Sequence, residues 1–396
     1  MAIRVGLGIS TDKDPLQAAK EASRNAKIQL GEEKIDFAVV FSTIEFSHLT
    51  VLQTIRSIIG DCALIGSSSF GLITNQGVFK SGLLVALFSL PANTHVNLAC
   101  LKQIGSRSGP SIGRDLADKL SYGFSDIPRH VGVLFPDGLL HGVSSILEGL
   151  QERFGKSFPV IGGSSSDDLS FKKTFQYFDR EVLSESISAM LWGGRLNFGF
   201  GIHHGWKPLG KPRYVTKSFG NAVLEIDGIP AVSIYREYFA SDIEKLRHEL
   251  KRISILYPIG IFIPGEEEYL LRNLLSIENN GALVFQGDVP KNSQIRLMIG
   301  TKESCLSATS QAIDAAKKGL ADRPCNFVFV FDSVSRYKLL GRQAGTEVEI
   351  IKERLGPEVP IIGMYTYGEQ APLEAIRYHG LTYFHNQSIA ALAIGA

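Results

Sequence analysis

The sequence predicts an α/β protein built from repeated strand-helix-strand-helix-strand units with mixed sheets. One observation is a pattern that occurs three times in the 396 residues: a buried-type strand, a polar helix, and an apolar strand that ends in a glycine-led run of small or hydroxyl residues. The second is that a further strand and helix precede each copy and that an apolar stretch follows it. Repetition at this length indicates the architecture before any motif is considered. Such alternation favours crossover connections and inner strands buried on both faces.

Each element of the three units has its counterpart in the others. The preceding strands are expected at 3–8, 96–104 and 295–299, and the strands that begin the copies at 37–43, 131–135 and 327–331. The following helices are expected around 50–59, 143–154 and 346–355, the small-residue runs at 66–69, 162–168 and 363–369, and the final apolar stretches at 82–90, 187–192 and 388–394.

The repeat is interrupted once, between Trp206 and Pro258. This segment predicts a strand pair around 221–226, a turn at 227–230, and helices over 231–239 and 241–252, because Gly and Pro mark turns and the last stretch is charged. We therefore predict two domains, residues 1–219 with two units and residues 220–396 with the connecting segment and the third unit. The boundary lies near Phe219.

Composition excludes several classes of protein. A net charge of +1 without a basic stripe gives no electrostatic basis for binding nucleic acid. No stretch reaches the roughly 18 apolar residues of a membrane span, and the first residues lack the pattern of a signal peptide. The four cysteines form no C-x-x-C spacing and mostly lie in apolar runs, which favours reduced, buried thiols. We expect a cytoplasmic protein that contacts no membrane.

A set of short motifs occurs in order along most of the chain. The motifs of the first half are Gly66-Ser67-Ser68, Gly162 to Asp168, His204 to Pro208, Thr216-Lys217-Ser218 and Asp227 to Ala231. Those of the second half are Phe331, Arg336, Tyr365 to Glu369 and Phe384-His385-Asn386. In this order the motifs resemble the FIST family over most of the chain. The chain has Ser333 where the family often has a cysteine, and the family's acidic pair is here split into Glu347 and Glu349.

The resemblance implies a FIST N-terminal domain at 1–219, a FIST C-terminal domain at 220–396, and a sensory role in signal transduction. It suggests small ligands such as amino acids, and the absence of a recognisable output pattern suggests a separate signalling protein as partner. Two alternatives stay open. One is a nitric oxide sensor with noncovalent haem, which the resemblance also suggests, and the other is an interaction scaffold that binds no metabolite.

The best candidate loop in the first half is the run Gly163, Ser164 and Ser165, which continues to Asp168. Loops at the carboxyl ends of strands are where open α/β sheets bind ligands, because glycine lets the backbone approach closely and free N–H groups attract anions. The hydroxyl groups can donate hydrogen bonds, and Asp167 or Asp168 can hold an ammonium group. The alternative is that small residues are needed here for close packing or a sharp turn.

In the second half, Arg336 and Glu369 are the candidate ligand contacts, with Tyr367, His385 and Asn386 beside them. A guanidinium can clamp a carboxylate with two parallel hydrogen bonds, and Glu369 can bind an ammonium group. The pair would suit an amino acid. The alternative is an ion pair that only stabilises neighbouring loops.

Signatures of catalysis and of metal binding are absent from the sequence. It contains no Walker loop, no dinucleotide fingerprint, no G-x-S-x-G elbow and no H-x-x-x-H or Cys/His cluster. We therefore expect no catalytic residues, no metal and no cofactor. A serine hydrolase that uses Ser165, His204 and Asp168 stays as an alternative, because a triad is established by geometry.

Overall fold

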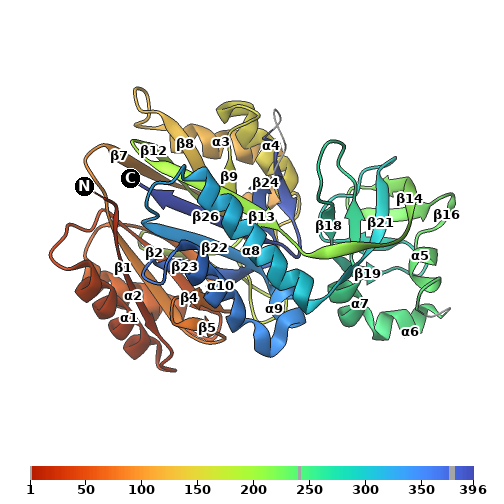
Figure 1. The fold of residues 1–396 in the computed structure, drawn as a ribbon, viewed down its shortest axis with the longest axis horizontal. Coiled ribbons are helices and arrows are strands. Elements are labelled where there is room, and N and C mark those ends of the chain that lie inside the picture. The colour runs from red at the N-terminus through yellow and green to blue at the C-terminus, as the bar shows by residue number, and fades with distance from the viewer. Residues whose placement is uncertain (1, 240–241, 374–379) are drawn as a thin grey trace.

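The computed structural model describes residues 2–239, 242–373 and 380–396. The chain forms a body of three six-stranded sheets and a smaller module with a sheet of its own, residues 206–300. Figure 1 shows the module, in green to cyan, at one end of the body, and both chain termini at the other. The structure confirms the predicted α/β fold with mixed sheets.

The first sheet shows the pattern that the other two repeat. Its strand order is β1 (Arg4–Ser10), β6 (Leu83–Ser89), β2 (Phe37–Thr43), β3 (Ala63–Ser69), β10 (Gln176–Phe178) and β11 (Glu181–Leu183). β2 and β3 are parallel, whereas β6 runs antiparallel to both of its neighbours. Helices α1 (Pro15–Leu30) and α2 (His48–Ile59) cover one face, and every residue of β2 is buried. The Asp14 carboxylate caps α1 by accepting from the first backbone N–H groups of the helix.

The second and third sheets have the same order of equivalent strands. The second contains β7 (Thr94–Leu101), β12 (Ile187–Gly194), β8 (Arg129–Pro136), β9 (Val160–Gly163), β24 (Glu369–Pro372) and β25 (Thr382–His385). The third contains β13 (Asn197–His203), β26 (Ile389–Gly395), β22 (Phe327–Ser333), β23 (Ile361–Thr366), β4 (Leu72–Thr74) and β5 (Gly77–Phe79). Their helices are α3 (Gly109–Ser121) and α4 (Val143–Phe154), and α8 (Lys302–Gly319), α9 (Val334–Leu340) and α10 (Gly345–Leu355). In the described part of the chain, no helix combines the length and apolar character needed to cross a bilayer.

The three units exchange hairpins in a cycle. The β10–β11 hairpin of the second unit completes the first sheet, β24–β25 of the third unit completes the second, and β4–β5 of the first unit completes the third. Each predicted small-residue run lies at the end of β3, β9 or β23, where the chain leaves one sheet to enter another. The exchange therefore brings the three runs together between the sheets.

The sheets enclose a common core on the faces turned away from the helices. Aromatic side chains of the three sheets are in contact there: the Phe88 and Phe327 ring centroids are 5.2 Å apart, and those of Phe41 and Phe135 are 5.7 Å apart. Phe331 packs against Phe135 at 5.9 Å. Burial of this apolar surface holds the units to one another.

One prediction within the third unit is wrong. The stretch 295–299, expected as its first strand, belongs to β21 (Gln294–Gly300) in the module, and β13 takes its place in the third sheet. The reason is the insertion: the chain passes from β13 into the module and returns through β21 directly before α8. Because β21 precedes α8 in sequence, the two resemble the first strand and helix of a unit.

The module has a separate apolar core and irregular, short elements. Its strands are β14 (Trp206–Phe219), β15 (Ala222–Ile226), β16 (Ile229–Pro230), β17 (Ile259–Ile261), β18 (Leu270–Arg272), β19 (Leu274–Ile277), β20 (Leu283–Phe285) and β21. The predicted helix 231–239 is only α5 (Ser233–Arg236), and the predicted helix 241–252 is replaced by α6 (Ile243–His248) and α7 (Leu250–Leu256). The paired strands β14 and β21 connect the module to the body, and Phe219, our predicted domain boundary, is the last residue of β14.

Candidate functional site

The predicted run around Gly163 lies in the junction where the three units cross. Ser166 N–H donates to Ser68 O at 3.2 Å, and Ser68 Oγ donates to Ser166 O at 3.0 Å. Ser166 Oγ and Ser69 Oγ both donate to Tyr365 O, at 2.5 and 2.9 Å. These hydroxyl groups donate to buried backbone carbonyls, which need hydrogen-bond partners away from water.

Gly163, Ser164 and Ser165 are themselves buried in this junction. A Cβ on Gly163 would lie 2.3 Å from Thr366 Cγ2, so the residue has no room for a side chain. Ser165 Oγ accepts from Gly138 N–H at 3.0 Å and from Gln176 Nε2 at 2.8 Å. The geometry favours the packing alternative for Gly163 and Ser165.

Asp168 and its neighbour Asp167 differ in environment. Asp168 is exposed, and its carboxylate accepts from Ser170 N–H at 3.1 Å within its own loop. Asp167 is buried and accepts from Tyr367 Oη and from the backbone N–H of Lys172 at 2.8 Å. Burial alone would raise the pKa of Asp167, but the hydrogen bonds that its carboxylate accepts hold the pKa below its ordinary value. Asp167 therefore fixes the loop 167–173 as a carboxylate anchor.

The loop 167–173 places an aromatic pair at the surface of the junction. The Phe171 ring stacks on the Tyr367 ring, with centroids 4.6 Å apart and planes inclined by 18°. The Tyr367 hydroxyl also accepts from Leu169 N–H at 3.0 Å. Tyr367, one of the predicted site residues, is thus held in position through its ring and through its hydroxyl group.

Arg336 is fully buried and its donors are used within the protein. Its guanidinium donates to Asp332 Oδ1 at 2.6 Å and to Glu347 Oε1 at 2.5 Å. Three further bonds go to His204 O, Cys305 O and Thr309 Oγ1. Such a guanidinium has no free edge for the two parallel bonds that a ligand carboxylate requires.

The carboxyl groups beside Arg336 are unusual because all of them are buried. Burial and the neighbouring charge of Glu347 raise the pKa of Asp332 well above its ordinary value. Burial likewise raises the pKa of Glu369 to about 8, although Thr366 Oγ1 and Ser388 N–H donate to its two oxygens at 2.5 and 3.1 Å. At neutral pH Glu369 is therefore mostly protonated. A neutral, buried carboxyl group is a poor partner for the ammonium group that we expected it to bind.

His385 is held within the body, and Asn386 connects the body to the module. Burial lowers the pKa of His385 to about 3, and the neutral ring donates from Nε2 to Ala371 O at 3.0 Å. Asn386 Oδ1 accepts from Asn273 N–H of the module at 3.2 Å. Sequence reasoning did not single out Arg272, whose guanidinium donates to Phe384 O at 3.0 Å and to Asp288 O at 3.0 Å. Arg272 can be identified as a contact between module and body only from the fold, which brings β18 next to β25.

Two adjoining cavities lie between the body and the module. The first chamber, of about 490 Å³, is lined by α7, by β19, and by the residues that follow β22 and β23. The second chamber, of about 800 Å³, lies next to the turn 138–144 and the module turns at 219–221 and 286–288. Phe171, Leu275 and Gln286 line both. Together the chambers form one cleft.

Only two of the predicted site residues line this cleft among the residues that the structure describes. Tyr367 lines the first chamber and Ser164 lines the second. Among the lining residues of either chamber that the structure describes, Gly163, Ser165, Asp168, Arg336, Glu369, His385 and Asn386 do not occur. The first chamber is instead lined by Ser333, Ser335 and Thr366, of which Ser333 and Thr366 are themselves buried. Sequence analysis named Ser333 as a departure from the family and Thr366 only as part of the motif Tyr365 to Glu369.

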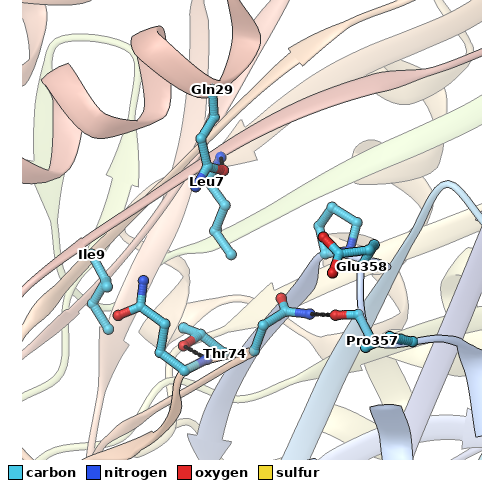
Figure 2. A pocket seen from close by; sticks show the side chains of 9 residues that line it. Leu7, Ile9, Gln29, Thr74, Pro357 and Glu358 are labelled. Atoms are coloured by element: carbon cyan, nitrogen blue, oxygen red, sulfur yellow. Dashed lines mark hydrogen bonds between the residues drawn. The ribbon is translucent and has the colours of Figure 1, made fainter. Parts of the chain in front are cut away.

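A smaller cavity of about 230 Å³ lies between the first and third sheets (Figure 2). Figure 2 shows Leu7 and Ile9 on one side and Pro357 and Glu358 on the other. Gln29 Oε1 accepts from Leu7 N–H at 3.0 Å, and Asn75 Nδ2 donates to Pro357 O at 3.1 Å. No predicted site residue lines this cavity among those described. Its two bonds lie within the first unit and between the β4–β5 hairpin and the third unit.

The candidate residues do not have the arrangement that a serine hydrolase triad or a haem ligand requires. Ser165, His204 and Asp168 make their hydrogen bonds to other groups, with His204 Nδ1 accepting from Trp206 N–H at 2.8 Å and His204 Nε2 lying 3.1 Å from Glu268 Oε2. His204 and His385 are buried against protein partners and are not lining residues of either chamber, which does not fit a haem ligand. Across residues 2–239, 242–373 and 380–396, no three His, Cys, Asp or Glu side chains converge as metal ligands do.

Comparisons with known proteins agree with the order of motifs. The FIST N domain model matches residues 36–229, and the FIST C domain model matches residues 231–372. An uncharacterized protein of Methanocaldococcus jannaschii is 27% identical over 93% of this chain and 75% of its own. Another, from Mycobacterium tuberculosis, is 22% identical over 96% of this chain and 98% of its own.

Among solved structures, a cyanuric acid hydrolase from A. caulinodans aligns with a TM-score of 0.39 at 10% identity, over 100% of this chain and 99% of that one. A second cyanuric acid hydrolase aligns with a TM-score of 0.35 at 8% identity, over 99% of this chain and 100% of that one. The two family models together cover most of the chain, so this protein belongs to the FIST family.

Proposed function

We propose that this protein is a cytoplasmic sensor that binds a small molecule in the cleft between its body and its module, without catalysis. FIST domains are associated with sensing in signal transduction. Amino acids are the ligand class that we expected from the resemblance, and they are included in the test below.

The observation that carries the proposal is the composition of the first chamber. Ser333 and Thr366 end the parallel strands β22 and β23, and ligands of α/β sheets bind outside the carboxyl ends of such strands. Leu169 and Phe171 come from the FIST N segment, whereas α7 and β19 come from the FIST C segment. A ligand in the chamber would contact both family domains at once.

Such a ligand can generate a signal only if it binds two states of the protein with different affinity. The module is joined to the body through the β14–β21 pair, and the segment between Trp206 and Pro258 that interrupts the repeat lies within the module. A ligand that contacts α7 and β19 on one side and β22 and β23 on the other favours the state in which they are close. The module surface would then present this state to a separate signalling protein.

The test is thermal unfolding of the whole protein against a broad panel of metabolites that includes the amino acids. A ligand at about 100 times its dissociation constant adds about 2.7 kcal/mol to the free energy of unfolding. Leu275→Trp should abolish the shift, because Leu275 lines both chambers and is 39% exposed, so that the larger ring can fill the cleft. Leu49→Trp, at a 55% exposed position on α2, is the matched control and should keep the shift.

Two outcomes would contradict the proposal. A shift of equal size in Leu275→Trp would place the binding site elsewhere. No shift with any member of the panel would favour the scaffold alternative, in which the repeated units present an interaction surface and bind no metabolite.

A further inference from the structure

We infer that the first chamber selects a small carboxylate with an apolar body, and that it recognises the carboxylate by charge but not an ammonium group. This inference rests on the proposed function, because it names the ligand class of the same site. We expected an amino acid as ligand. The chamber offers charged partners for the carboxylate of an amino acid but not for its ammonium group.

The charges of the chamber wall carry the first step. Lys251 on α7 and Lys338 on α9 are the charged side chains among its described lining residues, and both are exposed cations. The Lys338 Nζ atom lies 5.1 Å from the centroid of the Phe70 ring, a contact that holds the cation without neutralising it. Two cations on neighbouring helices at one cavity attract an anion.

The two acidic groups behind the strand ends of the chamber cannot compensate an ammonium group. Asp332 and Glu369 lie directly behind Ser333 and Thr366, but both carboxyl groups are fully buried and neither lines the chamber. Asp332 already accepts from Arg336, and Glu369 accepts from Thr366 and Ser388. A ligand ammonium group would therefore lose water without gaining a carboxylate, which is unfavourable.

The remaining wall is suited to an apolar body. Leu250, Ile255, Leu274 and Val334 contribute aliphatic surface, and the stacked Phe171 and Tyr367 rings contribute aromatic surface. The chamber volume of about 490 Å³ falls within the range of about 300–1,000 Å³ that is typical of small-molecule pockets. Burial of an aliphatic chain or an aromatic ring here supplies the affinity, and the lysines select the head group.

The polar floor of the chamber does not compete with the lysines for an anion. Asn273 Nδ2 donates to Gln286 Oε1 at 3.1 Å, and Gln286 Nε2 donates to Tyr367 O. The amide donors are thus used within the protein. Of the atoms of these two amides, Asn273 Oδ1 is an acceptor that is buried and has no hydrogen-bond partner among the described residues.

The experiment compares ligands that differ only in the head group. Calorimetric titration of the whole protein with 3-phenylpropionate, 3-phenylpropionamide, 3-phenylpropylamine and phenylalanine is repeated with the corresponding 4-methylpentyl compounds and leucine. We expect the carboxylate to bind about tenfold more tightly than the amide or the amine, with an advantage that decreases as salt is added. The amino acid should bind no more tightly than the carboxylate without the amine.

Two variants show whether the lysines cause the selection. Lys251→Gln/Lys338→Gln should weaken carboxylate binding about tenfold and leave amide binding unchanged. Lys245→Gln/Lys302→Gln, which removes two exposed cations outside the chamber lining, is the control and should change neither. Tighter binding of the amine, or a carboxylate preference that survives the first pair of substitutions, would overturn the ligand class while leaving a sensor in place.

A panel in which no compound of either series binds would also overturn the ligand class. The proposed function is judged separately, by whether the broad metabolite panel gives a shift that Leu275→Trp removes. The two results together distinguish a sensor with another ligand from a protein that is not a sensor.

Discussion

Single residues show how far side-chain type alone can predict a role. Arg336 lies on α9, just after β22, and Glu369 begins β24, just after β23, but their partners decide what they do. Asp332 is four residues before Arg336 and Glu347 is eleven after it, so no regular spacing reveals the buried cluster. Sequence patterns therefore predicted where charged groups lie along the fold, but could not predict that they face inward.

The first prediction at this scale concerns Arg336. Arg336→Met should lower the free energy of unfolding by about 3–5 kcal/mol, because it leaves the buried Glu347 carboxylate without its cation. Chemical denaturation measures this, and Arg336→Met/Glu347→Gln should recover part of the loss. Arg114→Met, which breaks the exposed pair with Glu152, should change stability by less than about 1 kcal/mol. Equal losses in the two single variants would contradict a buried ionic cluster.

The second concerns the pH dependence from Glu369, whose pKa is raised from 4.5 to about 8 by burial. Between these values the unfolded chain loses the proton and the folded protein keeps it, so this group's contribution to stability falls as pH rises and is constant above about 8. Glu369→Gln removes the ionisation and keeps the shape, so its stability relative to the native protein should increase between about pH 5 and pH 8. Denaturation at several pH values measures this; exposed Glu358→Gln is the control, and parallel curves for Glu369→Gln would contradict the buried carboxyl.

At the scale of elements, the repeat could be predicted because the packing of helices on strands requires small residues at equivalent positions of different units. A Cβ on Gly8 of β1 would lie 1.9 Å from Ala22 O of α1, and one on Gly201 of β13 would lie 2.1 Å from Ala312 O of α8. Equivalent strands thus use glycine where a helix approaches closely. The module lacks such regularity, because its helices have four to seven residues and several of its strands three, which is too short for a period to be recognised.

Gly201→Ala tests this close approach. The added methyl group must displace α8 or β13, so we expect a loss of about 1–3 kcal/mol in the free energy of unfolding, measured by denaturant titration. Gly345→Ala at the start of α10 meets no atom within 4 Å and should be neutral or stabilising, because alanine favours helices. Stability unchanged in Gly201→Ala would mean that the helix can move away at little cost.

At the scale of the whole molecule, the cleft could not be predicted because its walls come from distant parts of the chain. Leu169, Leu250, Leu275, Ser333 and Tyr367 meet only after the hairpins are exchanged and the module is placed. The two sequence halves and the family were recognisable from motifs in order along the chain. Their meeting point was not, since no local pattern encodes which turn of one unit faces which strand of another.

The cyclic exchange of hairpins also fixes how many units the protein can have. A unit cut out of the chain would lack the last two strands of its sheet and would carry a hairpin with no sheet to join. Two units would leave one sheet incomplete, and a fourth would have no opening in a closed ring. Loss or gain of a unit would therefore leave a sheet incomplete or a hairpin unpaired. We expect the three units to be inherited, expressed and unfolded together.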